Sequence, residues 1–183
     1  MARQSILVVF GGATGNAAFG INNIGQVVGT SDLAGDASFH GFLWQRGVIT
    51  DLGTLSGDFV SIANAINDKG QVAMQSCDIH FNCRAAIWQD GVMTDLNALM
   101  PVGSPLFLLF ANSINARGEM VGAAFDQRTG AIVPFLAVPR ENVYLSSSQV
   151  LERTRKIILP ERVRTMLRQQ RDHKFHTGAA FGR

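Results

Sequence analysis

The chain has 183 residues, 46% of them hydrophobic, which is enough for one sizeable core and excludes both two large domains and disorder throughout. Its formal net charge of +2 provides no strong attraction for polyanions, and no apolar run reaches the roughly 18 to 20 residues that a transmembrane helix needs. The charge is divided, because residues 1–140 carry a net −3 and residues 141–183 a net +5, which predicts a body followed by a basic tail.

The N-terminal apolar segment is short. Ile6–Phe10 follows a single basic residue, Arg3, and is too short for the apolar core of a secretory signal. The glycines that follow, Gly11, Gly12 and Gly15, resemble a dinucleotide-binding loop, whose amides would hold a pyrophosphate at a helix start. No strand-helix-strand pattern comes after them. We therefore interpret them as a turn between repeats and expect no cofactor.

One pattern occurs three times, each time as Ile-Asn-x-x-Gly ahead of a short apolar run. The copies begin at Ile21, Ile66 and Ile114, with spacings of 45 and 48 residues. A second pattern, Trp-Gln-x-Gly-Val-x-Thr-Asp-Leu, begins at Trp44 and returns 44 residues later at Trp88. Self-similarity at a nearly fixed period is the signature of a repeat architecture.

Alternating apolar residues, β-branched residues and turn signals predict four short strands in each unit. In the first unit they lie near 17–21, 26–31, 40–44 and 48–52, and in the second near 61–66, 71–76, 84–88 and 92–96. Asn-x-x-Gly suits the first turn because Asn and Gly tolerate left-handed backbone, and Arg46-Gly47 and Asp90-Gly91 mark a second hairpin. Each unit is predicted to be an antiparallel meander.

Such a meander has two apolar faces to cover, so neighbouring units must stack face to face. We expect an all-β fold of β-propeller-like repeats of about 45 residues, each a four-stranded antiparallel blade, with about three blades and a short C-terminal helix. Closed propellers have about 4 to 8 blades, so the stack is completed by a homo-oligomer, stays open, or belongs to a longer protein. By the same spacing, Ile6–Phe10 falls where the last strand of a preceding blade would lie.

Three strings stand in order along the body: Ala-Phe-Gly-Ile-Asn-Asn-Ile-Gly-Gln-Val-Val-Gly at 18–29, His-Gly-Phe-Leu-Trp-Gln-Arg-Gly at 40–47 and Thr-Asp-Leu-Gly-Thr-Leu-Ser-Gly at 50–57. Together they resemble the HAF-repeat family over roughly residues 10–139. The family is catalogued as extracellular repeat proteins of bacteria. The resemblance implies a propeller-like fold and an extracellular or cell-envelope location, but no reaction and no catalytic residues. Gly41 stands where the family pattern has Ala, and the third unit lacks the Trp.

Cys77 and Cys83 are the only cysteines, and they bracket a five-residue loop between the second and third strands of the second unit. Three interpretations remain open: a disulfide, two free thiols, or a metal site made of Cys77, His80 and Cys83. A structural zinc usually needs four ligands, and no fourth ligand is adjacent. Closing a short surface loop in an exported protein is the simpler use, so we predict a disulfide.

Candidate catalytic residues are few. Asp51 and Asp95 recur at equivalent positions after a Thr, and His40 is a candidate base. A repeated acid more often completes a hydrogen bond at a strand end, because structural repeats repeat their scaffold. Asp58 lies near a loop, yet no nucleophile, base and orienting acid can be placed together, and neither a nucleophile elbow nor a zinc-protease motif is present.

The aromatic residues Phe42, Trp44, Trp88 and Phe135 fall at strand positions. Their repetition in register favours packing between units over a sugar-stacking rim. The segment 101–110 inserts residues between the second and third units, and its apolar run predicts a core strand, or an association patch if it is exposed.

The basic tail at 141–183 contains a predicted helix near 160–171. Pro160 suits the first turn, and Val163, Met166 and Leu167 share one side. Isolated helices this short are marginal, so we expect a solvated or self-docked tail in preference to one held by nucleic acid or anionic lipid.

The leading hypothesis is a noncatalytic extracellular module that binds a ligand or protein through loops at one end of the blades. One alternative is a hydrolase acting on an extracellular polymer such as a polysaccharide, with carboxylates of neighbouring blades meeting at an axis. The other is an inactive fragment of a longer repeat protein. Nucleic acid is not an expected partner.

Overall fold

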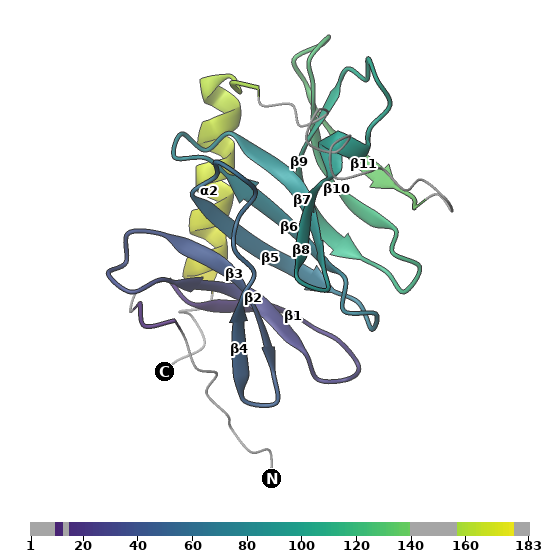
Figure 1. Cartoon of the computed structure of the whole chain (residues 1–183). Coiled ribbons are helices and arrows are strands. Elements are labelled where there is room, and N and C mark those ends of the chain that lie inside the picture. The colour runs from purple at the N-terminus through teal and green to yellow at the C-terminus, as the bar shows by residue number, and fades with distance from the viewer. Residues whose placement is uncertain (1–9, 13–14, 140–156, 178–183) are drawn as a thin grey trace.

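The computed structural model describes residues 10–12, 15–139 and 157–177. These residues form three antiparallel sheets and one C-terminal α-helix (Figure 1). The expected all-β class with a helix at the end of the chain is confirmed at this level. The described residues do not close into a ring. Most of the predicted strand at Ile6–Phe10 lies outside the described residues.

The first two sheets are four-stranded meanders, as predicted. The first sheet contains β1 (Ala17–Ile21), β2 (Val27–Asp32), β3 (Phe39–Gln45) and β4 (Val48–Asp51) in that order. The second sheet contains β5 (Val60–Ile66), β6 (Val72–Cys77), β7 (Cys83–Gln89) and β8 (Val92–Asp95). Both have a register irregularity at the same place in the repeat, between Ala18 and Gly20 and between Ala63 and Ala65.

The third sheet differs from the other two. A short 3-10 helix, η1 (Leu96–Leu99), leads to β9 (Leu106–Ile114), β10 (Met120–Asp126) and β11 (Ile132–Ala137). Within the described residues this sheet has three strands, so the expectation of a four-stranded blade is not met here. The inserted apolar run forms the core strand β9, in which Phe107, Leu108 and Leu109 are buried. It is not an exposed association patch.

The Asn-x-x-Gly segments form the predicted turns and also connect neighbouring sheets. In each turn the glycine has a positive φ, 79° at Gly25 and 76° at Gly70, which a residue without a side chain adopts at little cost. Asn22 Nδ2 donates to the carbonyl oxygen of Asn67 at 3.0 Å, and Asn67 Nδ2 donates to that of Asn115 at 2.9 Å. One repeated side chain therefore links three sheets in series.

The sheets stack through their first strands. Strand β5 packs against β2 and β3, and β9 packs against β6 and β7. The stacking is tight at Gly41, because a Cβ at this position would lie 2.6 Å from Met74 Cε and 3.0 Å from the amide nitrogen of Ala63, so a larger residue would require its neighbours to shift. This close approach favours glycine at position 41.

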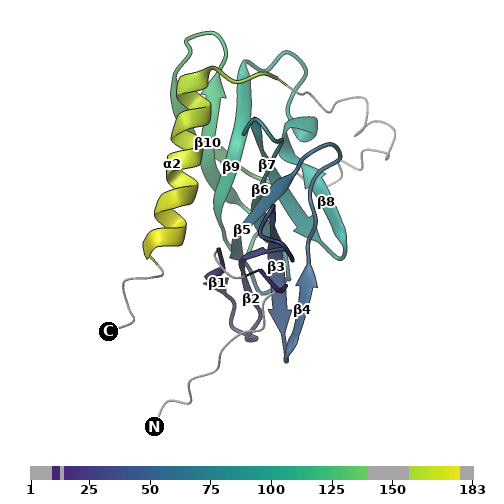
Figure 2. The ribbon, with the colours of Figure 1, turned by 90° about the vertical axis from the view of Figure 1, so that its left-hand side faces the viewer.

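The tail helix packs on the body. Helix α2 (Glu161–Thr177) starts directly after Pro160, as predicted, and extends beyond the predicted end at 171. Figure 2 shows it beside β9 and β10, with its far end near β1. Leu159, Val163 and Leu167 are 1%, 2% and 0% exposed, in one core cluster with side chains of β5, β9 and β10. Of the two predicted states, solvated or self-docked, the structure has the second.

We predict that the helix contributes to the global stability of the protein. Leu167→Ala should lower the free energy of unfolding by about 2–5 kcal/mol, because it leaves a cavity in a filled core. Gln169→Ala, on the exposed face of the same helix, should change it by less than about 0.5 kcal/mol. Chemical denaturation followed by circular dichroism measures both, and equal small effects would show that the helix does not pack on the body.

Candidate functional site

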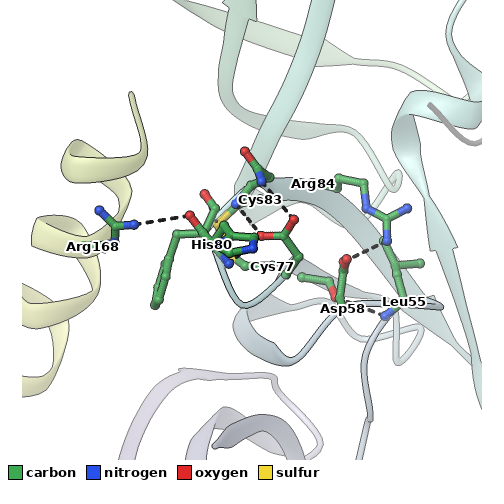
Figure 3. The surroundings of a disulfide bond; sticks show 11 residues. Leu55, Asp58, Cys77, His80, Cys83, Arg84 and Arg168 are labelled. Carbon is green, nitrogen blue, oxygen red and sulfur yellow. Dashed lines mark hydrogen bonds and ion pairs between the residues drawn. A yellow bond between two sulfur atoms is a disulfide. The ribbon is translucent and has the colours of Figure 1, made fainter. Parts of the chain in front are cut away.

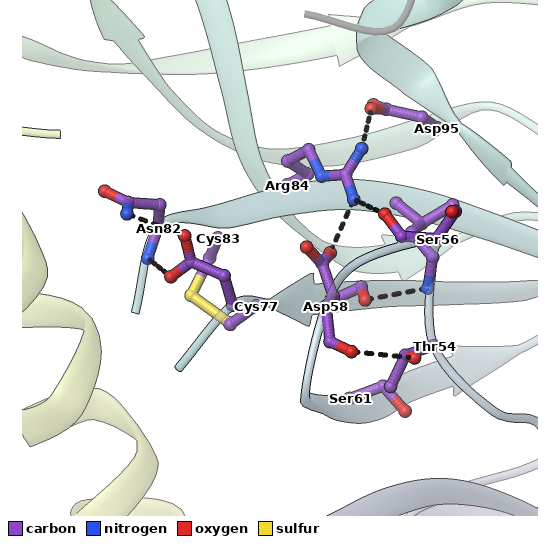
Figure 4. A network of polar contacts seen from close by, with 12 residues as sticks. Thr54, Ser56, Asp58, Ser61, Cys77, Asn82, Cys83, Arg84 and Asp95 are labelled. Carbon is purple, nitrogen blue, oxygen red and sulfur yellow. Dashed lines mark hydrogen bonds and ion pairs between the residues drawn. A yellow bond between two sulfur atoms is a disulfide. The ribbon is translucent and has the colours of Figure 1, made fainter. Parts of the chain in front are cut away.

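A buried charge cluster joins the second sheet to the connection that precedes it. Arg84 of β7 places Nη2 2.8 Å from Asp58 Oδ2 and Nη1 3.0 Å from Asp95 Oδ2 (Figure 4). Arg84 Nη2 also donates to the carbonyl oxygen of Ser56 at 3.3 Å. The three charged side chains are only 1–3% exposed. One guanidinium therefore bridges two carboxylates away from water, and this ties the loop to the sheet.

Asp95 also accepts hydrogen bonds at the end of β8. Its Oδ1 accepts from the backbone amide of Asn97 at 2.8 Å and from Asn97 Nδ2 at 3.0 Å. Asn97 in turn bonds to both backbone groups of Leu108 in β9, at 2.7 Å and 3.0 Å. The candidate carboxylate thus belongs to a chain of contacts that reaches the third sheet. Sequence reasoning missed Asn97, for which the repeat gave no signal.

The first sheet contains a similar pair at the equivalent positions. His40 Nδ1 lies 2.9 Å from Asp51 Oδ2 and 3.0 Å from Oδ1, and the amide of Gly53 donates to Asp51 Oδ1 at 2.7 Å. His40 and Asp51 precede Arg84 and Asp95 by the same 44 residues. His40, Asp51 and Asp95 are candidates from the sequence and Arg84 is not, although the shared spacing of 44 residues relates the two pairs.

The His40–Asp51 pair is more open than the buried cluster, with side chains 18% and 42% exposed. The hydroxyl of Ser61 in β5 makes two hydrogen bonds to the backbone close to this pair. It accepts from the amide of Gly41 at 2.9 Å and donates to the carbonyl oxygen of Gly53 at 2.5 Å. This hydroxyl joins the second sheet to the first. Each of the two repeated carboxylates is therefore engaged with a basic residue of its own sheet.

The two cysteines form the predicted disulfide, with an S–S distance of 2.06 Å (Figure 3). They are register partners at the ends of β6 and β7, and both are buried. The alternatives of two free thiols and of a metal site with His80 are wrong, because both sulfur atoms are bonded to each other. Among the residues that the structure describes, no three metal-ligating side chains of His, Cys, Asp or Glu come together.

The loop closed by the disulfide is ordered by Asp78. Its Oδ1 accepts from the amides of His80 at 2.8 Å and Asn82 at 2.9 Å. Burial acts to raise the pKa of Asp78, but the hydrogen bonds from Asn82 and His80 outweigh it, so its pKa lies below the usual value. Phe81 has a left-handed backbone with φ 63°. The result is a loop with several internal hydrogen bonds that presents one aromatic ring and several polar groups.

Helix α2 uses this loop as its main polar support. The amide of Leu159, just before the helix, donates to Asn82 Oδ1 at 2.8 Å. Figure 3 shows the second contact, in which Arg168 Nη2 donates to the carbonyl oxygen of His80 at 3.3 Å. The guanidinium groups of Arg168 and Arg171 lie 5.5 Å and 4.9 Å from the centre of the Phe81 ring. Several cations of the tail are therefore engaged with the body. No sequence signal had connected the loop with the tail.

The aromatic candidates do not form an exposed rim as a group. Phe42 and Phe135 are buried, while Trp44 and Trp88 are partly buried, and Trp88 packs against the core between the first two sheets. Within the part of the chain that the structure describes, no helix has the length and apolar character needed to cross a membrane.

Comparison of the chain with protein-family models, with curated proteins and with solved structures finds no match.

We predict that Arg84 contributes more to the free energy of unfolding than His40 does. Arg84→Met should lower the free energy of unfolding by about 3–5 kcal/mol, because it leaves two buried carboxylates without their cation. His40→Met, the matched change in the first sheet, should cost about 1 kcal/mol or less, since its partner is solvated. Urea denaturation at neutral pH compares the two variants, and equal losses would argue against a buried ionic clamp.

Proposed function

We propose that this chain is a noncatalytic extracellular β-repeat module that binds a protein or another ligand through loops at one end of its sheets. In this proposal the sheets are propeller-like blades of a bacterial HAF-repeat protein. The meander order of the first two sheets, their face-to-face stacking and the spacing of about 45 residues support the propeller-like assignment. The disulfide supports an oxidising location outside the cytoplasm.

The observation that carries the proposal is the difference between the two ends of the sheets. At one end, the β1–β2, β5–β6 and β9–β10 turns repeat the same Asn-x-x-Gly chemistry and are hydrogen-bonded in series. At the other end, the loops at 33–38, 78–82 and 127–131 share no such pattern. Variable loops on a repeated scaffold are typical of a recognition surface.

The contacts of the candidate catalytic residues favour a structural role for them. Asp95 is buried with Arg84, and Asp51 holds both His40 and the amide of Gly53. These contacts repeat with the structural unit, whereas an active site is usually built once from diverse parts. A hydrolase would have to rely on the His40–Asp51 pair, the more accessible of the two.

The proposal is tested by measuring binding and turnover on the same set of molecules. Defined polysaccharides, esters and peptides are titrated into the wild type, into a variant whose 33–38 loop is replaced by Gly and Ser, and into Ile24→Ser at the opposite end. We expect a ligand whose binding the loop variant loses and Ile24→Ser keeps, without turnover. Reproducible turnover that Asp51→Ala abolishes would contradict the noncatalytic assignment and favour the hydrolase.

A homo-oligomer that completes the stack remains a prediction. Val121 and Leu136 face each other across β10 and β11 and are 46% and 64% exposed at the last sheet.

A further inference from the structure

The stack has two ends at which, within the described residues, no further sheet packs. The second sheet contacts the first sheet on one face and the third sheet on the other (Figure 1). The first and third sheets therefore each have one outer face. Because the units repeat, the contacts made by equivalent positions at the two internal interfaces indicate what each outer face is built to contact.

The outer face of the third sheet exposes two apolar residues that belong to a repeated pair. Val121 and Leu136 are register partners across β10 and β11 and are 46% and 64% exposed. The equivalent register pairs of the first and second sheets are Val28–Leu43 and Ala73–Ile87. Both pairs pack in the core against the following sheet, and the first member of each is 0% exposed. The positions that hold one sheet against the next are therefore open to solvent on the third sheet.

Helix α2 does not cover this pair. The core cluster that contains the helix includes Phe125 near the end of β10, whereas Val121 lies near the start of that strand. Figure 1 shows β11 on the side of the stack away from α2. The exposed pair is a surface distinct from the core beneath the helix.

The outer face of the first sheet exposes an isoleucine that its equivalents bury. Ile21 is 71% exposed, whereas Ile66 and Ile114 at the same position of the repeat are 8% and 9% exposed. Ile66 packs in the core between the first and second sheets, and Ile114 in the core between the second and third. Both therefore pack against the preceding sheet. Ile21 has the corresponding position on a sheet that no other described sheet precedes.

The hydrogen bonds of the Asn-x-x-Gly turns run in the same direction. The side-chain amide of an Asn has two hydrogens, and those of Asn22 and Asn67 each donate once within their own turn and once to the next sheet. Among the described residues, Asn115 Nδ2 donates only to Glu119, which lies in its own turn. The carbonyl oxygen of Asn22 accepts from an amide of its own turn, but among these residues it accepts from no other sheet, unlike that of Asn67. The stack thus ends in a spare donor on the third sheet and a spare acceptor on the first.

We propose that the outer face of the third sheet binds the outer face of the first sheet of a second copy of this chain. Val121 and Leu136 then pack against Ile21 of the second copy, and the side-chain amide of Asn115 donates to the carbonyl oxygen of Asn22. A second copy is the partner because every copy has both faces in equal number, and because the two internal interfaces already show how such faces pack. The interface joins two different surfaces, so association is head to tail.

This inference rests on the proposed function, because it takes the sheets to be units of a repeat stack, and it deepens that function by naming the partner that extends the stack. The ligand-binding loops proposed above lie at the opposite end of the strands from Asn22 and Asn115. Association therefore leaves them available.

Sedimentation equilibrium of the full chain without ligand tests the association. We expect the weight-average mass of the wild type to rise above that of one chain as the concentration approaches about 100 μM. Ile21→Asp and Val121→Asp should each weaken association at least about tenfold, because a carboxylate would be buried against an apolar surface. Both positions are exposed in the single chain, so both variants should keep the circular dichroism spectrum and Tm of the wild type.

Mixing these two variants tests the head-to-tail geometry. Ile21→Asp keeps an intact third-sheet face, and Val121→Asp keeps an intact first-sheet face. An equimolar mixture should therefore form a complex with one copy of each variant, although neither variant associates alone. The complex should stop at two copies, since both of its remaining outer faces have the substitution.

Val48→Asp is the matched control. Val48 is 66% exposed in the first sheet, and its equivalent Val92 is still 63% exposed in the second sheet, which has neighbours on both faces. This position of the repeat therefore does not pack between sheets. Val48→Asp should associate as the wild type does.

Three results would overturn the inference. The first is a wild type that stays monomeric at about 1 mM. The second is a mixture of Ile21→Asp and Val121→Asp that stays monomeric although the wild type associates, which would show that a face pairs with itself. The third is a loss of association in Val48→Asp as large as that in Ile21→Asp. None of these results bears on ligand binding, whereas turnover that Asp51→Ala abolishes would refute the proposed noncatalytic function and leave the association intact.

Discussion

The whole structure depends on covering apolar surface that three stacked sheets leave open. Each sheet begins with an edge strand, β1, β5 or β9, and these strands lie along one side of the stack. Phe107 and Leu109 of β9 are buried there together with Leu159 and Leu167 of the tail. A short isolated helix is marginal in water, and an uncovered edge strand invites pairing with other chains. Each element stabilises the other, so the basic tail completes the fold of the body.

The polar contacts between and within the sheets also serve the scaffold. The hydrogen bonds from Asn22 and Asn67 to the next turn recur with the unit, and the two base–acid pairs stand at equivalent positions with a recurring Asp but a different base. The partner changes with burial. In the buried cluster Arg84 pairs with both Asp58 and Asp95, whereas His40 pairs with the more exposed Asp51. Because these groups serve the scaffold, the function proposed for the chain depends on its variable loops.

Local features of the fold were predictable from the sequence, and contacts between distant segments were not. Gly25 and Gly70 indicate turns in the sequence because only a few residues accept a positive φ. The spacing of Cys77 and Cys83 indicates a loop closed by a disulfide. Asp58 lies 26 residues before Arg84, and the position 45 residues before Asp58 is Ala13, so the repeat gave no sign of this partner. An apolar stripe on α2 predicts that something covers it, but the stripe does not specify which surface.

Hydrogen–deuterium exchange of the intact chain tests most directly whether α2 is part of the folded core. We expect backbone amides of α2 around Val163 and Leu167 to be protected to a degree comparable with those of β5 and β9, because they open only with the packed core. Exchange of these amides within seconds, as in an isolated helix, while β5 stays protected, would show that α2 is not part of the folded core.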